Sequence, residues 1–65
     1  MTGRVARLIS EKGFGFITTG GSDDYFFHRD DCPEFDLIAV GDNVEFTEAT
    51  TDKGLRAYNV GKSYD

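Results

Sequence analysis

The chain has 65 residues, is 38% hydrophobic, and carries a net charge of −5 from 7 Lys and Arg against 12 Asp and Glu. This length and composition predict one folded domain over residues 1–65, and the acidic total argues against a duplex binder held mainly by phosphate contacts. One cysteine, Cys32, excludes an internal disulfide, and no apolar stretch is long enough for a signal peptide or a membrane span. We therefore expect a cytoplasmic protein without membrane association.

Five runs of alternating or β-branched residues predict five strands. In chain order they are 4–9 (RVARLI), 13–19 (GFGFITT), 25–29 (YFFHR), 43–49 (NVEFTEA) and 56–60 (RAYNV), with Gly- and Asp-rich turns between them. No helical period is present, and closing the strands into a barrel would remove the edges that promote aggregation. The expected fold is all-β, a small five-stranded antiparallel Greek-key barrel of the OB type.

The second and third predicted strands are rich in aromatic residues on both faces. If their loop is centred near Gly21, Phe16 lies opposite Phe26 and Phe14 lies opposite His28, and the period of two places these four on one face. The other face then carries Ile17, Tyr25 and Phe27. The glycines next to these phenylalanines, Gly13 and Gly15, allow the backbone to bend or a ligand to approach closely.

A compact core can be formed without the face that carries Phe14, Phe16, Phe26 and His28. Its expected members are Val5, Ile17, Tyr25, Phe27, Ile38, Val44, Phe46 and Val60. This choice leaves Phe14, Phe16 and Phe26 outside as an exposed aromatic surface, with Lys12 at one end and Arg7 beside it. The pattern alone leaves open that these phenylalanines are core, because buried Phe is common. His28 could likewise be structural, since its ring nitrogens are easily satisfied at a strand end.

Two motifs carry a resemblance to a known family. "SEKGFGFI" (10–17) and "DDYFFH" (23–28) resemble the two ribonucleoprotein motifs of the bacterial cold-shock domain, and "GRV", "GDNVEF" and "KG" followed by "NV" extend the match along nearly the whole chain. The resemblance implies an OB-type barrel that binds single-stranded RNA or DNA by base stacking and acts as an RNA chaperone or a regulator of transcription or translation. By matched positions it implies the binding residues Lys12, Phe14, Phe16, Asp24, Phe26, His28 and Phe35.

The chain departs from the family pattern at several stacking positions. Arg7 occupies the place of the usual tryptophan, Leu8 that of a phenylalanine and Arg29 that of another, and the loop between His28 and Phe35 is about two residues short. Arginine can stack on a base and contact phosphate, so Arg7 and Arg29 either compensate or are solvated charges. Further candidate phosphate contacts are Lys53 and Arg56, which could equally belong to a charged turn. Weaker binding than is usual for the family is expected.

Other functions find little support in the sequence. There is no phosphate-binding glycine loop, and His28 and Cys32 are too few for a metal or nucleophile site. We expect a monomer that is not an enzyme, without cofactor, metal or small-molecule substrate. The alternative hypothesis is a protein-interaction module whose aromatic surface grips a basic peptide, which the acidic net charge favours.

Overall fold

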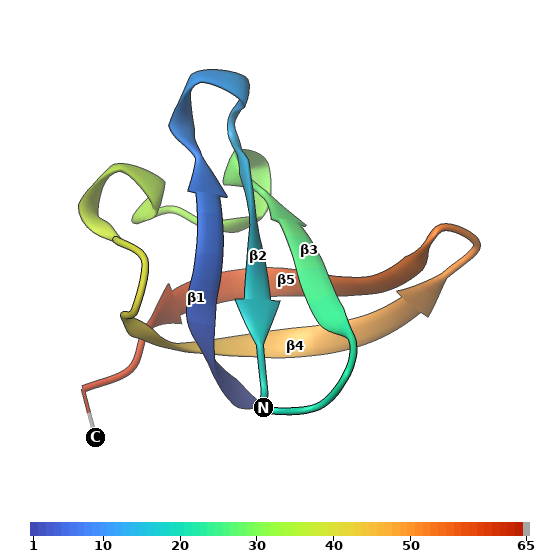
Figure 1. Ribbon diagram of the computed structural model, residues 1–65. Helices are drawn as coiled ribbons and strands as arrows, with labels where there is room; N and C mark the ends of the chain where they lie inside the picture. The colour runs from blue at the N-terminus through green and yellow to red at the C-terminus, as the bar shows by residue number, and fades with distance from the viewer. Residues whose placement is uncertain (65) are drawn as a thin grey trace.

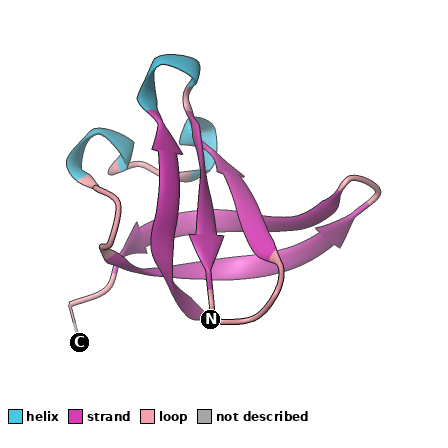
Figure 2. Cartoon of the chain, viewed as in Figure 1, coloured by secondary structure: helices cyan, strands magenta, loops and turns pink. Residues whose placement is uncertain are grey.

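The computed structural model describes residues 1–64, which form a closed barrel of five strands (Figures 1 and 2). The strands are β1 (Thr2–Ile9), β2 (Phe14–Thr18), β3 (Asp24–His28), β4 (Asn43–Thr51) and β5 (Gly54–Lys62). Their order around the barrel is β1-β2-β3-β5-β4. The predicted all-β five-stranded barrel is confirmed.

Strand directions follow from the odd number of strands. A closed ring of five strands cannot alternate in direction throughout, so at least one neighbouring pair must be parallel. Here that pair is β3 with β5, joined at Phe26 and Arg56, whereas β1–β2, β1–β4, β2–β3 and β4–β5 are antiparallel. The parallel pair places β5 beside the edge of β3 that does not pair with β2.

The connections contain short 3-10 turns that the sequence pattern did not predict. Within residues 1–64 these are η1 (Ser10–Lys12), η2 (Arg29–Asp31) and η3 (Phe35–Leu37), coloured as helix in Figure 2. β4 and β5 extend further than predicted, and their hairpin projects from the barrel body (Figure 1). No helix within the described part of the chain is long and apolar enough to cross a membrane.

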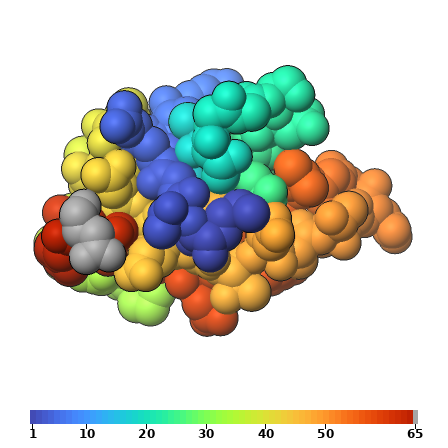
Figure 3. All heavy atoms as spheres, turned by 90° about the horizontal axis from the view of Figure 1, so that it is seen from below, coloured from blue at the N-terminus to red at the C-terminus, as the bar shows by residue number. Residues whose placement is uncertain are grey.

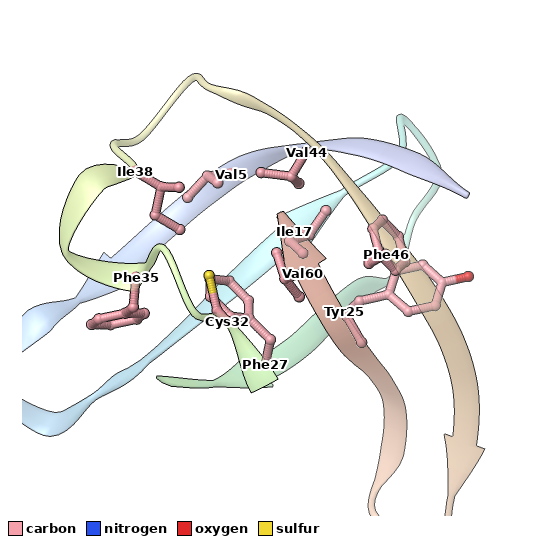
Figure 4. Packing of buried hydrophobic residues seen from close by; sticks show 11 residues of the cluster. Val5, Ile17, Tyr25, Phe27, Cys32, Phe35, Ile38, Val44, Phe46 and Val60 are labelled. Carbon is pink, nitrogen blue, oxygen red and sulfur yellow. The ribbon is translucent and has the colours of Figure 1, made fainter. Parts of the chain in front are cut away.

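The core lies between the inner faces of the strands and beneath the loop that carries η2 and η3 (Figure 4). All eight predicted core residues are buried, and Ile17 and Phe27 have no exposed surface. Cys32, Phe35 and Ala57 join them. The Tyr25 hydroxyl points away from the cluster and donates a hydrogen bond to Glu48 Oε2 at 2.7 Å, so the ring is buried without leaving its polar atom unpaired.

Gly15 explains why a glycine stands between two phenylalanines. A Cβ at this position would point inward and lie 2.8 Å from the Phe27 ring and 2.8 Å from the backbone oxygen of Arg7. The space is thus needed by the largest core side chain rather than by a ligand. Gly13 has a different role, because it ends η1 with a left-handed φ of 74° that favours glycine.

Candidate nucleic-acid interface

Three phenylalanine rings gather on the outer face of the β2–β3 hairpin. Phe14 and Phe16 from β2 and Phe26 from β3 have ring centroids 5.5 to 5.9 Å apart, and we call them the aromatic cluster. The predicted register is confirmed, with Phe16 opposite Phe26 and Phe14 opposite His28. Each ring of the aromatic cluster remains partly exposed while the intervening residues of both strands are buried. The barrel therefore has the orientation in which these phenylalanines lie outside the core.

A β-bulge places Arg7 beside the aromatic cluster. Strict alternation from the buried Val5 would turn Arg7 inward, but the β1–β2 register shifts between them, so that Val5 pairs with Ile17 and Arg7 pairs with Phe16. The Arg7 Cζ lies 5.6 Å from the Phe16 ring centroid, within the range of a cation–π contact. The side chain is exposed and extends the apolar surface with a positive charge.

Arg56 flanks the aromatic cluster from the opposite side. Its Cζ lies 5.5 Å from the Phe26 centroid and 5.1 Å from the Tyr58 centroid, and its Nη2 donates to Asp31 Oδ2 at 3.3 Å. Nε of the same guanidinium is buried without a hydrogen-bond partner. Tyr58 was not among the predicted site residues, although its spacing of two from Arg56 on a strand would have placed both on one face.

A groove runs between the aromatic cluster and the tip of the β4–β5 hairpin. Its volume is about 710 Å³, and its lining includes Phe16, Phe26, His28, Lys53 and Arg56. Lys53, at the hairpin turn, is exposed on the rim. Two aromatic faces, a histidine and two cations therefore share one concave surface.

His28 also lines this groove, and its Nδ1 lies close to Asp30. Its Nδ1 accepts a hydrogen bond from the Asp30 backbone N–H at 3.1 Å. A neutral imidazole whose Nδ1 accepts must carry its hydrogen on Nε2. No hydrogen bond from Nε2 forms within residues 1–64, so this nitrogen can donate to an acceptor such as a base carbonyl or a phosphate oxygen.

Phe35, which the family resemblance implied as a binding residue, is buried in the structure. Phe35 is only 4% exposed and packs edge-on against Phe27 with centroids 6.1 Å apart. The short connection after His28 folds into η2 and η3 over one end of the barrel, which turns this ring into the core (Figure 4). The Arg29 Cζ lies 5.5 Å from the Phe35 centroid and its Nη2 lies 3.8 Å from Asp36 Oδ1, so Arg29 covers Phe35 and is not in the aromatic cluster.

The remaining predicted residues lie at the ends of the same outer face. Lys12 is exposed at the end of η1, just before β2. Asp24 is exposed at the start of β3, opposite Thr18 and two residues before Phe26. Two residues, Lys12 and Asp24, thus lie at the margins of the surface, and Arg29 and Phe35 lie apart from it. The structure brings the other predicted site residues together: Arg7, Phe14, Phe16, Phe26, His28, Lys53 and Arg56.

Cys32 takes no part in this surface. It is 1% exposed in the core, and burial raises the pKa of its thiol, which disfavours the thiolate that a nucleophile or metal ligand needs. Among residues 1–64, no group of three or more His, Cys, Asp or Glu side chains is placed to hold a metal ion.

Comparison with known proteins agrees with this architecture. Residues 1–63 match the model of the 'Cold-shock' DNA-binding domain. The chain is 44% identical over 62 residues to the cold shock-like protein CspG of Shewanella violacea, covering 91% of this chain and 89% of that protein. It is 42% identical over 62 residues to the cold shock-like protein CspA of Stigmatella aurantiaca, covering 91% of both chains. Nucleic-acid binding without enzymatic activity is the property of this family as a whole. The chain belongs to the cold-shock domain family.

Proposed function

We propose that this protein binds single-stranded RNA or DNA by stacking bases on the aromatic cluster. The observation that carries the proposal is the group of three partly exposed rings within 5.5 to 5.9 Å of one another on the outer face of the barrel. Contiguous exposed apolar surface of this kind marks binding sites, and each stacked base contributes about 1–3 kcal/mol. Stacking tolerates any base sequence because every base has a π-face.

The charges around the aromatic cluster support a strand rather than a duplex as the ligand. Arg7 and Arg56 flank the rings and Lys53 borders the adjoining groove, so cations adjoin the rings although the chain carries −5 overall. Two carboxylates lie beside them, because Asp31 pairs with Arg56 and Asp52 also lines the groove. A duplex keeps its bases stacked inside and would offer this surface phosphates and groove edges but no free base face. A single strand can place bases on the rings and phosphates beside the arginines.

We further propose a cellular role as an RNA chaperone that acts as a monomer in the cytoplasm, with regulation of transcription or translation as a consequence. Fewer stacking surfaces than the family pattern provides, with Phe35 in the core, favour weak and sequence-tolerant contacts. Such contacts hold a strand unpaired and release it readily, which is what a chaperone of RNA structure requires.

The test compares three ligands under the same low-salt conditions. Tyrosine fluorescence and electrophoretic mobility are measured with a single-stranded oligothymidine, with a duplex of the same length, and with a basic peptide. We expect binding to the single strand, weak or no binding to the duplex, and no saturable response to the peptide. Preference for the peptide would establish the protein-interaction alternative instead.

The salt dependence gives a second measure of the mechanism. For single strands, the logarithm of the affinity falls by about 0.7 per neutralised phosphate for each logarithmic unit of salt. With two or three cations beside the aromatic cluster in contact, a slope of about −2 or shallower is expected. A slope of about −5 or steeper would show that phosphate contacts, and not stacking, dominate the affinity.

A further inference from the structure

A second groove lies on the outer face of the barrel beyond the aromatic cluster. Its volume is about 540 Å³, and the side chains that matter here are Arg4, Thr18, Thr19, Asn43 and Ser63. We call it the Arg4 groove. In the view of Figure 3, the start of β1 lies between the β2–β3 loop and the start of β4. None of these residues is among the binding residues that the family resemblance implied.

Strand register places this groove on the same face as the aromatic cluster. Thr18 lies two residues beyond Phe16 on β2, so both side chains point outward. Arg4 pairs with Thr18 on one side and with Asn43 on the other. The row Thr18–Arg4–Asn43 therefore lies next to the row of Arg7, Phe16 and Phe26, about 7 Å further along the strands.

The bulge in β1 is what makes the two rows continuous. Without it, Arg4 and Arg7, three positions apart, would point to opposite faces of the strand. With it, both guanidinium groups lie on the outer face, one in each row. Arg4 is exposed, and among residues 1–64 no carboxylate forms an ion pair with it. Its charge is thus free to meet a ligand.

The groove's other side chains suit a sugar–phosphate backbone better than a base. They are hydroxyls and an amide, with no aromatic ring on which a base could stack. The Thr18 Oγ1 accepts a hydrogen bond from the Gly20 N–H at 3.2 Å, which leaves its own O–H free to donate. Asp24, the acidic neighbour in this row, is separated from Arg4 by Thr18, two strand spacings or about 10 Å away. On the other side Glu45 pairs with Thr2 and is the diagonal neighbour of Arg4, about 7–8 Å away. A phosphate is therefore placed at the Arg4 guanidinium itself, between these two carboxylates.

We propose that a single strand leaving the aromatic cluster at Phe16 continues into the Arg4 groove, where Arg4 binds a backbone phosphate and the hydroxyl and amide groups bind phosphate or sugar oxygens. This inference rests on the proposed single-strand function. It lengthens the binding surface by about one nucleotide beyond the stacked bases. It also assigns a binding role to a cation outside the aromatic cluster.

The experiment separates the two parts of the surface by ligand length. Wild type and Arg4→Gln are titrated with oligothymidines of four and eight nucleotides, the shorter chosen to occupy the aromatic cluster alone. We expect Arg4→Gln to bind the longer strand about three- to tenfold more weakly and the shorter one with unchanged affinity. Its salt slope with the longer strand should be shallower by about 0.7. In the wild type, the amide NMR signals of Thr18 and Asn43 should shift with the longer strand only.

Lys62→Gln is the matched control. It removes the same charge from a lysine whose Nζ lies 3.6 Å from Asp42 Oδ2, outside the Arg4 groove, and it should leave both affinities nearly unchanged. Three results would refute a binding role for the Arg4 groove while leaving the proposed function intact. They are an equal loss of affinity for both strand lengths in Arg4→Gln, the same loss of affinity in Lys62→Gln, and no loss of affinity in Arg4→Gln. Failure of the wild type to bind either strand would instead refute the proposed function itself.

Discussion

Phe26 and Phe27 provide a direct test of which face of β3 is functional. The two residues are adjacent and chemically identical, but Phe27 has no exposed surface whereas Phe26 is partly exposed in the aromatic cluster. Changing each singly to alanine removes the same atoms from opposite sides of the barrel wall. We expect Phe27→Ala to abolish folding and Phe26→Ala to abolish much of the binding.

The magnitudes follow from burial. Truncating a buried Phe costs about 3–5 kcal/mol, and a domain of this length has a total stability of about 3–10 kcal/mol, so Phe27→Ala should leave little or no folded protein. Phe26 contacts Phe14, Phe16 and Arg56 on one side only, and its removal should lower the free energy of unfolding by about 1–2 kcal/mol. The lost stacking surface should weaken single-strand binding by about 1–3 kcal/mol, or roughly five- to 150-fold.

The assay combines urea unfolding, followed by far-ultraviolet circular dichroism, with oligothymidine titration of each variant that folds. The informative result is a difference between the two variants: Phe27→Ala should lose its stability, and Phe26→Ala should lose its affinity for the oligothymidine. If Phe26→Ala unfolds the protein and Phe27→Ala does not, the assignment of inner and outer faces is wrong. If Phe26→Ala folds and binds like the wild type, the aromatic cluster is not the stacking surface.

Three further predictions concern single positions. Gly15→Ala should destabilise the domain by about 1–3 kcal/mol in urea unfolding, because the new Cβ would lie 2.8 Å from the Phe27 ring. The control Gly21→Ala should be nearly neutral, because apart from its chain neighbours no atom lies within 4 Å of the new Cβ. Arg7→Trp should strengthen oligothymidine binding above about 0.2 M salt and change it little at low salt, because it exchanges a screened charge for stacking area; weaker binding at every salt concentration would identify Arg7 as a specific contact. The hydrogen bond to Glu48 raises the pKa of Tyr25 above its ordinary value of 10.0. This hydrogen bond therefore stabilises the fold fully below pH 10.0, and the stabilisation is lost as the pH rises through the raised pKa. Spectrophotometric titration should show one tyrosine that ionises later than the others, and this ionisation should be absent in Tyr25→Phe.

Much of the barrel could be predicted from local pattern. Alternation in β2 and β3 assigned each aromatic residue to a face, because a side-chain period of two leaves no other choice once the hairpin register is set. Alternation left open which of the two faces is the core, and the expected choice is confirmed, since Val5, Phe27 and Val44 are all buried. These results depend on contacts between chain segments close in sequence or on hydrophobicity alone, and both can be read without coordinates.

The loop after His28 shows what strand alternation does not determine. Motif position implied that Phe35 is a binding residue, yet its ring is in the core. A loop side chain has no alternation to constrain it, so its direction depends on whether the barrel end beneath it is already filled. Here η2 and η3 bring Cys32 and Phe35 over that end, and burial of the Phe35 ring against Phe27 is the more favourable outcome.

The sequence by itself determined the family, the strands and the two faces of the central hairpin, because these depend on residue type and spacing. Only the tertiary structure decided which cations join the aromatic cluster. Arg7 points outward because of a bulge that breaks strand alternation, and Arg56 reaches Phe26 because an odd-stranded barrel closes through a parallel pair thirty residues apart in sequence. The parallel pair is set by closing five strands into a barrel, and the bulge by the register between β1 and β2, so both depend on how strands pair and not on the pattern of a single segment.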